Sequence, residues 1–226
     1  MNGVSTNSHI AVGNANNARH ARHSDQLLEA SRRIDWRFLL PNPELRDAAY
    51  VGAANNEHSR SLALFCTSLT EVKTFPTDGK LSSQYDIVVV SDPTGEMLRG
   101  AAELVRPGGF LYVEVYGLFS LARFRRRSAW RNNMRGLRLR HPAGYVALAE
   151  QLGFIDVQTH WHWPNFETCT KIIPLDNHEA IRYAFALSGW KLIGRLQTVF
   201  GRWPLWHGLL GWAVPCFSIM ALRSSQ

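Results

Sequence analysis

The sequence is poor in two features that mark secreted and membrane proteins. Its three cysteines, Cys66, Cys169 and Cys216, are odd in number and widely spaced, so they provide neither a disulfide framework nor the paired spacing of a zinc site. No run of residues approaches the roughly 20 consecutive apolar residues that a membrane-spanning helix requires. We therefore expect a cytoplasmic protein without a metal site, with peripheral contact to a membrane as the alternative.

The sequence also lacks internal repeats, and its 226 residues are too few for two domains of average size. The first 24 residues are rich in Asn, Ser, His and small residues, with no pattern that would build a core and no apolar segment of a secretory signal. We therefore expect residues 1–24 to form a disordered tail and residues 25–226 to form one globular domain.

Acidic residues are missing from one basic stretch of the chain, which we call the arginine cluster. Repulsion among so many like charges favours an anionic partner, which Arg126, Arg127 and Arg131 would contact. A substrate phosphate, a nucleic acid and an anionic membrane surface all have the required charge, although nothing indicates specific recognition of a nucleic acid. A solvated helical face is the alternative. The cluster consists of Arg123, Arg125, Arg126, Arg127, Arg131, Arg135, Arg138 and Arg140.

Two apolar segments in the middle of the chain have the composition of buried strands. Residues 86–92 form a β-branched run, and Pro107, Gly108 and Gly109 lead into a second run at residues 110–114. Two such strands joined by a crossover of about a dozen residues are typical of parallel neighbours that are buried on both faces. We predict a doubly wound α/β sheet, which would place ligands at the carboxyl ends of its strands.

Further elements are predicted on both sides of this pair. An apolar, tryptophan-bearing helical insertion at about residues 176–212 would cover the sheet, act as a lid over an apolar substrate, or lie at a membrane interface. The other predicted elements are strands at residues 48–52, 71–75, 155–163 and 215–223, and helices at residues 56–69 and 141–153.

The segments "YDIVVV…LVRPGGFLYVE" and "ALAEQLGFIDVQTHW" resemble class I S-adenosylmethionine-dependent methyltransferases. In that family an aspartate opens the fourth strand, a Pro-Gly-Gly turn leads into the fifth, and Gly-Phe precedes the sixth. The resemblance implies a mostly parallel Rossmann-like sheet with an antiparallel last strand, S-adenosylmethionine as cofactor, and methyl transfer to a small-molecule or lipid-linked acceptor. Because the interval from Gly52 to Asp86 is too short for two βα units, we expect the sheet to be shortened at one edge.

The resemblance also implies a cofactor loop between the first strand and the first helix. Gly52 matches the first glycine of the family's loop, where backbone approaches the ligand beside a helix N-terminus. Tyr50 stands in place of the usual acid, and Ala54 and Asn56 stand in place of the later glycines, so a plain strand-to-helix turn is the alternative. The family's ribose-binding acid has no direct match, which leaves Asp78 as a displaced substitute.

Candidate catalytic groups lie at the predicted carboxyl ends of the later strands. Asp92 could contact the cofactor or act as a general base if burial raises its pKa, or it could cap the following helix. His160 and His162 are expected on one face of a strand, with tryptophans on the other, where they would act as bases or be structural. Tyr116 ends the fifth strand nearby and is a candidate substrate contact.

Two other functions remain open. A methyltransferase-like protein that has lost its cofactor could serve as a binding or scaffold module, which the altered loop favours. A peripheral membrane or nucleic-acid binder could act through the arginine cluster and the tryptophan-bearing insertion. Fold analogy cannot choose among these three.

Overall fold

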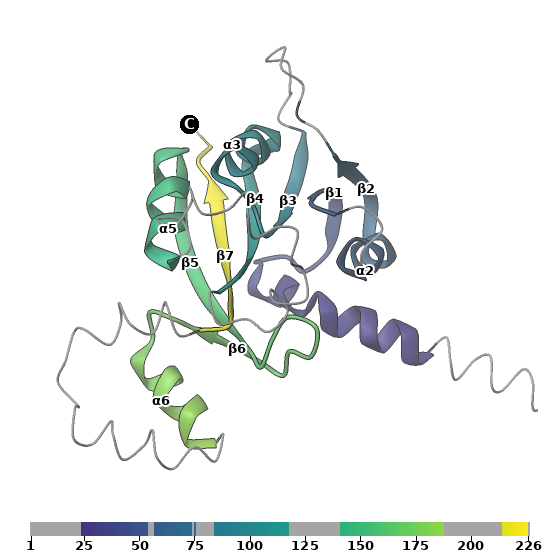
Figure 1. The fold of residues 1–226 in the computed structure, drawn as a ribbon. Coiled ribbons are helices and arrows are strands. Elements are labelled where there is room, and N and C mark those ends of the chain that lie inside the picture. The colour runs from purple at the N-terminus through teal and green to yellow at the C-terminus, as the bar shows by residue number, and fades with distance from the viewer. Residues whose placement is uncertain are drawn as a thin grey trace, which may run out of the picture.

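The computed structural model describes residues 24–53, 57–73, 75, 84–117, 141–187 and 214–225. In these residues the strands form one sheet in the order β2-β1-β3-β4-β7-β5-β6 (Figure 1). The strands are β1 (Leu45–Val51), β2 (Cys66–Val72), β3 (Tyr85–Ser91), β4 (Val105–Tyr116), β5 (Phe154–Trp163), β6 (Lys171–Pro174) and β7 (Cys216–Arg223). The helices are residues 24–33, η1 (Asp35–Leu39), α2 (Glu57–Phe65), α3 (Gly95–Leu104), α5 (Pro142–Gln151) and α6 (His178–Leu187).

The directions of the strands match the mostly parallel sheet expected from the sequence. Strands β2, β1, β3 and β4 pair in parallel, whereas β7 is antiparallel to both β4 and β5. β5 therefore runs in the same direction as β4. The carboxyl ends of these five parallel strands, β2, β1, β3, β4 and β5, lie at the same edge of the sheet. β2 is the outermost strand beside β1, in line with the predicted shortening. The predicted doubly wound, mostly parallel α/β sheet is confirmed.

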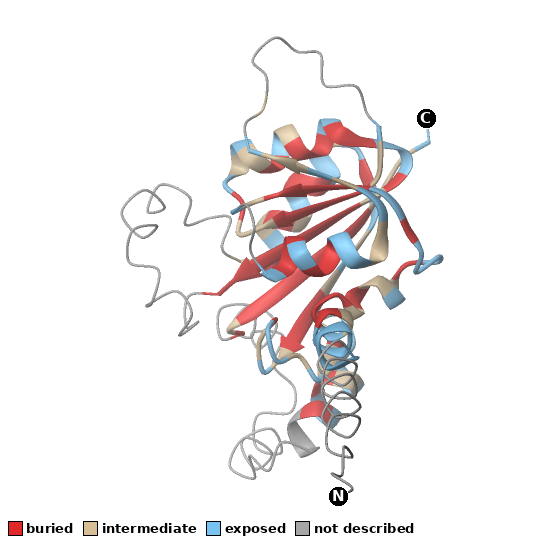
Figure 2. Ribbon diagram, turned by 90° about the vertical axis from the view of Figure 1, so that its right-hand side faces the viewer, coloured by how far each residue is buried: buried red, intermediate tan, exposed pale blue. Residues whose placement is uncertain are grey.

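Each face of the sheet is covered by a different part of the chain, and buried residues concentrate on the central strands (Figure 2). One face packs Ala49, Val88, Val113 and their neighbours against α3 and α5. The other face packs against residues 34–40 and α2. A sheet with helical layers on both faces is the doubly wound arrangement.

The Pro-Gly-Gly turn at the start of β4 has a steric explanation. Gly108 has a φ of +75°, which is a left-handed conformation that favours glycine. A Cβ on Gly109 would lie 2.9 Å from the carbonyl oxygens of both Arg106 and Asp86, so the backbone approaches too closely for any other residue. The turn therefore permits the tight pairing of β4 with β3.

The structure differs from the prediction at the edge of the sheet. Helix α2, predicted to run to residue 69, ends at Phe65. Strand β2 begins at Cys66, five residues earlier than predicted. β2 pairs continuously with β1, from Leu45 opposite Cys66 to Val51 opposite Val72. Its β-branched residues favour a strand over a helix, and this pairing overrides the helical spacing in the sequence.

The predicted insertion is only partly described. α6 lies within it and packs on β5 and β6, and the sequence reasoning missed the short strand β6. Residues 188–213 and the predicted tail at residues 1–23 lie outside the described part of the chain. None of the described helices is long and apolar enough to cross a lipid bilayer.

Candidate functional site

The carboxyl ends of β1 and β3 are the place where the topology favours ligand binding. From β1 the chain passes to β2 on one side and then returns to β3 on the other side. Ligands of open α/β sheets bind at such a switch point, outside the carboxyl ends of the strands. Gly52 follows β1 and Asp92 follows β3 at this edge.

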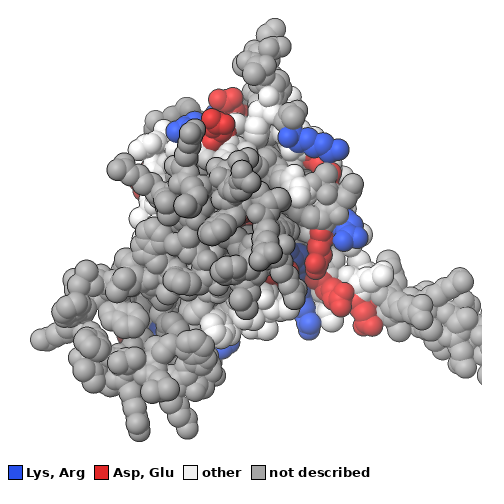
Figure 3. Space-filling model, viewed as in Figure 1, with Lys and Arg blue, Asp and Glu red and all other residues white. Residues whose placement is uncertain are grey.

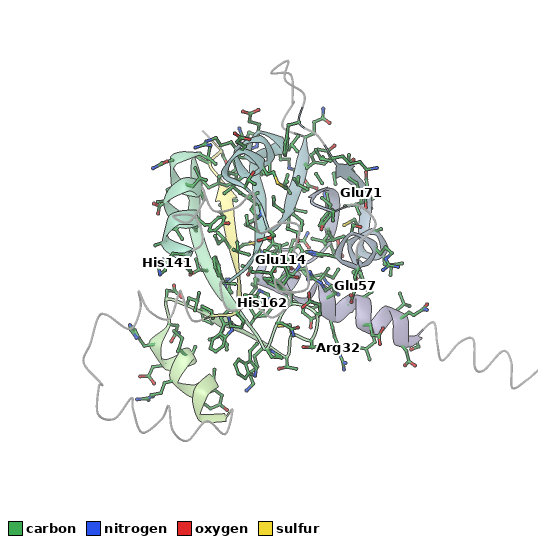
Figure 4. All side chains as sticks on the ribbon, viewed as in Figure 1. Arg32, Glu57, Glu71, Glu114, His141 and His162 are labelled. Carbon is green, nitrogen blue, oxygen red and sulfur yellow. The ribbon has the colours of Figure 1, made fainter. Side chains whose placement is uncertain are left out.

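A buried ion pair lies beside the switch point. Glu114 of β4 is fully buried, and Arg33 from the helix at residues 24–33 is only 6% exposed. The guanidinium donates two hydrogen bonds to the carboxylate, of 2.7 Å to Oε1 and 2.6 Å to Oε2. Such paired hydrogen bonds fix both groups in place. Figure 4 shows Glu114 inside the fold, near His162.

The two charges stabilise one another. Burial alone would raise the pKa of Glu114, but Arg33 and His58 more than offset it and hold that pKa well below its usual range. Burial opposes the charge of Arg33, and the adjacent carboxylate nonetheless raises its pKa. The pair is therefore ionised at neutral pH and carries no net charge.

His58, the second residue of α2, completes this group. Its Nδ1 lies 3.2 Å from Oε2 of Glu114 without hydrogen-bond geometry, so the contact is electrostatic. Its Nε2 has no hydrogen-bond partner among the described residues, although the side chain is only 2% exposed. A buried polar group without a partner costs about 1–3 kcal/mol. Burial is the main cause of a lowered pKa for His58, which keeps the ring neutral.

A second polar group surrounds His162 on the same face of the sheet. Its Nε2 lies 2.8 Å from Oγ of Ser218 and 3.4 Å from the hydroxyl of Tyr112. Its Nδ1 lies 3.5 Å from Sγ of Cys169. The Tyr112 hydroxyl also donates to Glu114 at 3.4 Å, which connects the two groups. Burial lowers the pKa of His162 to about 3, so the ring is neutral at physiological pH.

The predicted alternation along β5 agrees with the structure. His160 and His162 are both buried, whereas Trp161 lies in an apolar cluster with α6 on the other face. Burial also lowers the pKa of His160. In the described part of the chain no three His, Cys, Asp or Glu side chains are arranged to hold a metal ion.

Asp92 lies at the switch point, but it does not cap α3. The N-cap is Thr94, whose hydroxyl accepts a hydrogen bond of 3.2 Å from the backbone N–H of Met97, so the capping alternative for Asp92 is wrong. Asp92 has a φ of +47°, and its backbone N–H donates to the Glu114 carbonyl at 2.7 Å. This bond joins the end of β3 to β4.

The two described residues of the predicted cofactor loop contact one another. Tyr50 is 1% exposed, and a Cβ placed on Gly52 would lie 2.7 Å from the Tyr50 hydroxyl. The phenol ring therefore lies against the glycine, and a larger residue at position 52 would require this ring to move. Tyr116 lies further along the same edge, where its hydroxyl donates to Glu167 at 2.8 Å.

The remaining predicted site residues lie outside the described part of the chain. These are Ala54, Asn56, Asp78, Arg126, Arg127 and Arg131. On the face shown in Figure 3, described side chains of both charges are visible, and much of the surface belongs to residues that are not described. The predicted anion contact of the arginine cluster therefore stays a prediction.

The sequence reasoning missed the central members of the site. Arg33 and Glu114 are 81 positions apart, and His58 lies in a helix that has no motif. One signal was present, because Glu114 interrupts an otherwise apolar run in β4. A charged residue in a buried strand requires a partner of opposite charge.

No family model matches this chain, and no curated protein matches its sequence. Solved structures that resemble it include S-adenosylmethionine-dependent methyltransferases. One from Archaeoglobus fulgidus is 15% identical with a TM-score of 0.48, and the match covers 84% of this chain and 92% of that one. One from Thermotoga maritima is 10% identical with a TM-score of 0.45, covering 90% and 96%.

Another similar structure is phosphoethanolamine N-methyltransferase 2 of Haemonchus contortus in complex with S-adenosylmethionine. It is 15% identical with a TM-score of 0.40, and the match covers 80% of this chain and 49% of that one. At this level of identity and overlap we take from these structures no residue role, acceptor or partner.

The polar groups at the switch point suit S-adenosylmethionine. This molecule presents an ammonium group and ribose hydroxyls, which are donors, and a carboxylate. Asp92, directly after β3, has a carboxylate that accepts hydrogen bonds, and backbone N–H groups at the start of α2 suit an anionic group.

Proposed function

We propose that this chain binds S-adenosylmethionine at the carboxyl ends of β1 and β3 and transfers its methyl group to a small-molecule or lipid-linked acceptor. The observation that carries the proposal is the placement of Gly52, Asp92 and the group formed by Arg33, Glu114 and His58 around one switch point. Polar side chains gathered at that edge are typical of a ligand site.

Different residues have different roles in this proposal. Gly52, Asp92 and the backbone N–H groups at the start of α2 hold the cofactor, which supplies an electrophilic methyl group when bound. Tyr116, His160 and His162 lie further along the edge, on β4 and β5, and they contact the acceptor. The arginine cluster binds an anionic group of that acceptor. Positioning of the two reactants supplies most of the rate enhancement.

Calorimetric titration with S-adenosylmethionine and S-adenosylhomocysteine tests the proposal. We expect micromolar binding by the natural sequence. Asp92→Asn should weaken it at least about tenfold, a loss of roughly 1.4 kcal/mol, because the variant removes a charged acceptor. Asp156→Asn is a matched control, since Asp156 has a similar φ of +50° but lies near the amino end of β5. Asparagine tolerates this conformation at both positions.

Two results would contradict the proposal. If the natural sequence does not bind either compound at millimolar concentration, the chain is a methyltransferase-like fold without the cofactor. If Asp92→Asn and Asp156→Asn bind equally well, the cofactor does not lie at the end of β3.

A further inference from the structure

The environment of His58 determines which of its nitrogens carries a proton. Nδ1 faces the Glu114 carboxylate at 3.2 Å, and Arg33 keeps that carboxylate ionised through two hydrogen bonds. An ionised carboxylate favours positive partial charge beside it, so the neutral imidazole is more stable with its proton on the nitrogen that faces the carboxylate. A neutral imidazole has a single N–H group. Nε2 therefore has a free lone pair in a buried position.

We propose that Nε2 of His58 is the proton acceptor of this site, and that it binds and deprotonates an N–H or O–H group of the methyl acceptor. This inference rests on the proposed function and narrows the acceptor to amines and hydroxyl compounds. The bond from carbon to the acceptor atom forms while the bond from carbon to sulfur breaks, and the displaced proton moves to Nε2. The resulting imidazolium lies beside the Glu114 carboxylate, which stabilises its charge.

The other titratable groups on this edge are less suited to that role. Both nitrogens of His162 already have close polar contacts, with Ser218 and Tyr112 on one side and Cys169 on the other. His58, in contrast, has a carboxylate within ion-pair distance of Nδ1, at 3.2 Å. A histidine held by a carboxylate, with its second nitrogen available, has the arrangement of a general base.

His58 lies close in sequence to the carboxyl end of β1. It is the second residue of α2, and on the other side of the connection Gly52 is half-buried and Ala53 is exposed. The rings of Trp36 and Tyr50 lie edge-on to the imidazole at centroid distances of 6.3 and 5.6 Å. These rings contribute to the burial that lowers the pKa of His58 and keeps the imidazole neutral.

Imidazole nitrogen NMR of the full chain tests the inference directly. His58→Asn assigns the signal, and it retains an N–H group that can face Glu114 while removing Nε2. We expect His58 to carry its proton on Nδ1 at pH 7. In protein saturated with S-adenosylhomocysteine, we expect butylamine or phenol to shift the Nε2 signal in the direction of hydrogen bonding. The control His141→Asn, which preserves the cap of α5, should leave these shifts unchanged.

The outcomes separate this inference from the proposed function. A proton on Nε2 at pH 7 would overturn the inference, as would an unmoved Nε2 signal with both probes while S-adenosylhomocysteine is bound. Failure of S-adenosylhomocysteine to bind in calorimetry would instead overturn the proposed function. Equal binding of S-adenosylhomocysteine by His58→Asn and the natural sequence, with loss of the probe response, would support both.

Transfer of a labelled methyl group to either probe gives a second readout. His58→Asn should lower kcat roughly 100-fold to 10,000-fold and leave the affinity for S-adenosylmethionine unchanged. The rate should fall with decreasing pH as Nε2 becomes protonated. Glu114 and Glu167 raise the pKa of His58, and Arg33 lowers it. Glu114 is a positioning residue, and Glu114→Gln should move the proton to Nε2. Unchanged kcat in His58→Asn would overturn the inference.

Discussion

The same strands present apolar side chains to one face of the sheet and include a buried ion pair on the other face. On β4, Leu111 and Val113 point into an apolar layer beneath α3 and α5. The alternate residues Tyr112 and Glu114 point to the face covered by residues 34–40 and α2, where Arg33 reaches Glu114. One face is packed by this apolar cluster, and the other carries paired charges at its carboxyl edge.

The difference indicates which face is maintained for function. Apolar burial contributes to stability at roughly 25 cal/mol per Å². A buried ion pair contributes little net stability, because desolvation offsets most of the attraction, and apolar replacements are often neutral or stabilising. The pair of Arg33 and Glu114 is therefore better explained by a site that requires it than by a need for stability.

The largest expected effect comes from breaking the charged pair. Glu114→Gln should lower the free energy of unfolding by about 3–5 kcal/mol, because it leaves Arg33 charged and buried without a carboxylate. Urea denaturation measures the change. Leu111→Ala, on the opposite face of the same strand, should cost about 2–5 kcal/mol through a cavity, but it should leave binding of S-adenosylhomocysteine to the folded protein intact.

A double variant sharpens this comparison. Arg33→Met combined with Glu114→Leu removes both charges, so it should recover most of the stability lost in Glu114→Gln and still not bind ligand normally. If the double variant is as unstable as Glu114→Gln, the pair stabilises the fold in its own right. The two faces would then not differ in the way we infer.

The apolar face was predictable from the sequence, and the charged face was not. The β-branched run in β3 and the Pro-Gly-Gly turn before β4 specify local structure through neighbouring residues, so the strands and their direction followed. Arg33 belongs to a helix that precedes the sheet, and it is 81 positions away from Glu114 in the sequence. A pattern of neighbouring residues cannot predict a contact between positions so far apart.

Some positions have a second, spatial cause that the sequence does not reveal. Gly52 was assigned to the cofactor by resemblance, and the packing of the Tyr50 ring is a further reason for a glycine there. The short strand β2 was displaced in the prediction because its pairing with β1, rather than its own periodicity, determines where it begins. In both cases a neighbour in space decides the outcome.

Gly52 allows the packing and the ligand explanations to be separated. Gly52→Ala should cost about 1–3 kcal/mol through overpacking against Tyr50. Adding Tyr50→Leu should recover part of that stability, because the phenol ring is no longer in the way. If the glycine also serves the cofactor, the double variant should still bind S-adenosylhomocysteine weakly in calorimetry. Normal binding by the double variant would mean that only Tyr50 requires the glycine.

The smallest expected effect concerns the pH dependence of stability on the charged face. The pKa of His162 is about 3 in the folded protein, below its ordinary value of 6.5, so between these values the unfolded chain binds more protons. Its contribution is present above pH 6.5 and is lost as the pH falls, by at most about 1.4 kcal/mol per pH unit. Urea denaturation between pH 7 and 5 should therefore show a shallower loss of stability in His162→Asn than in His141→Asn. If the free energy of unfolding depends on pH equally in both variants, water reaches His162, and this face is more accessible to solvent than the apolar one.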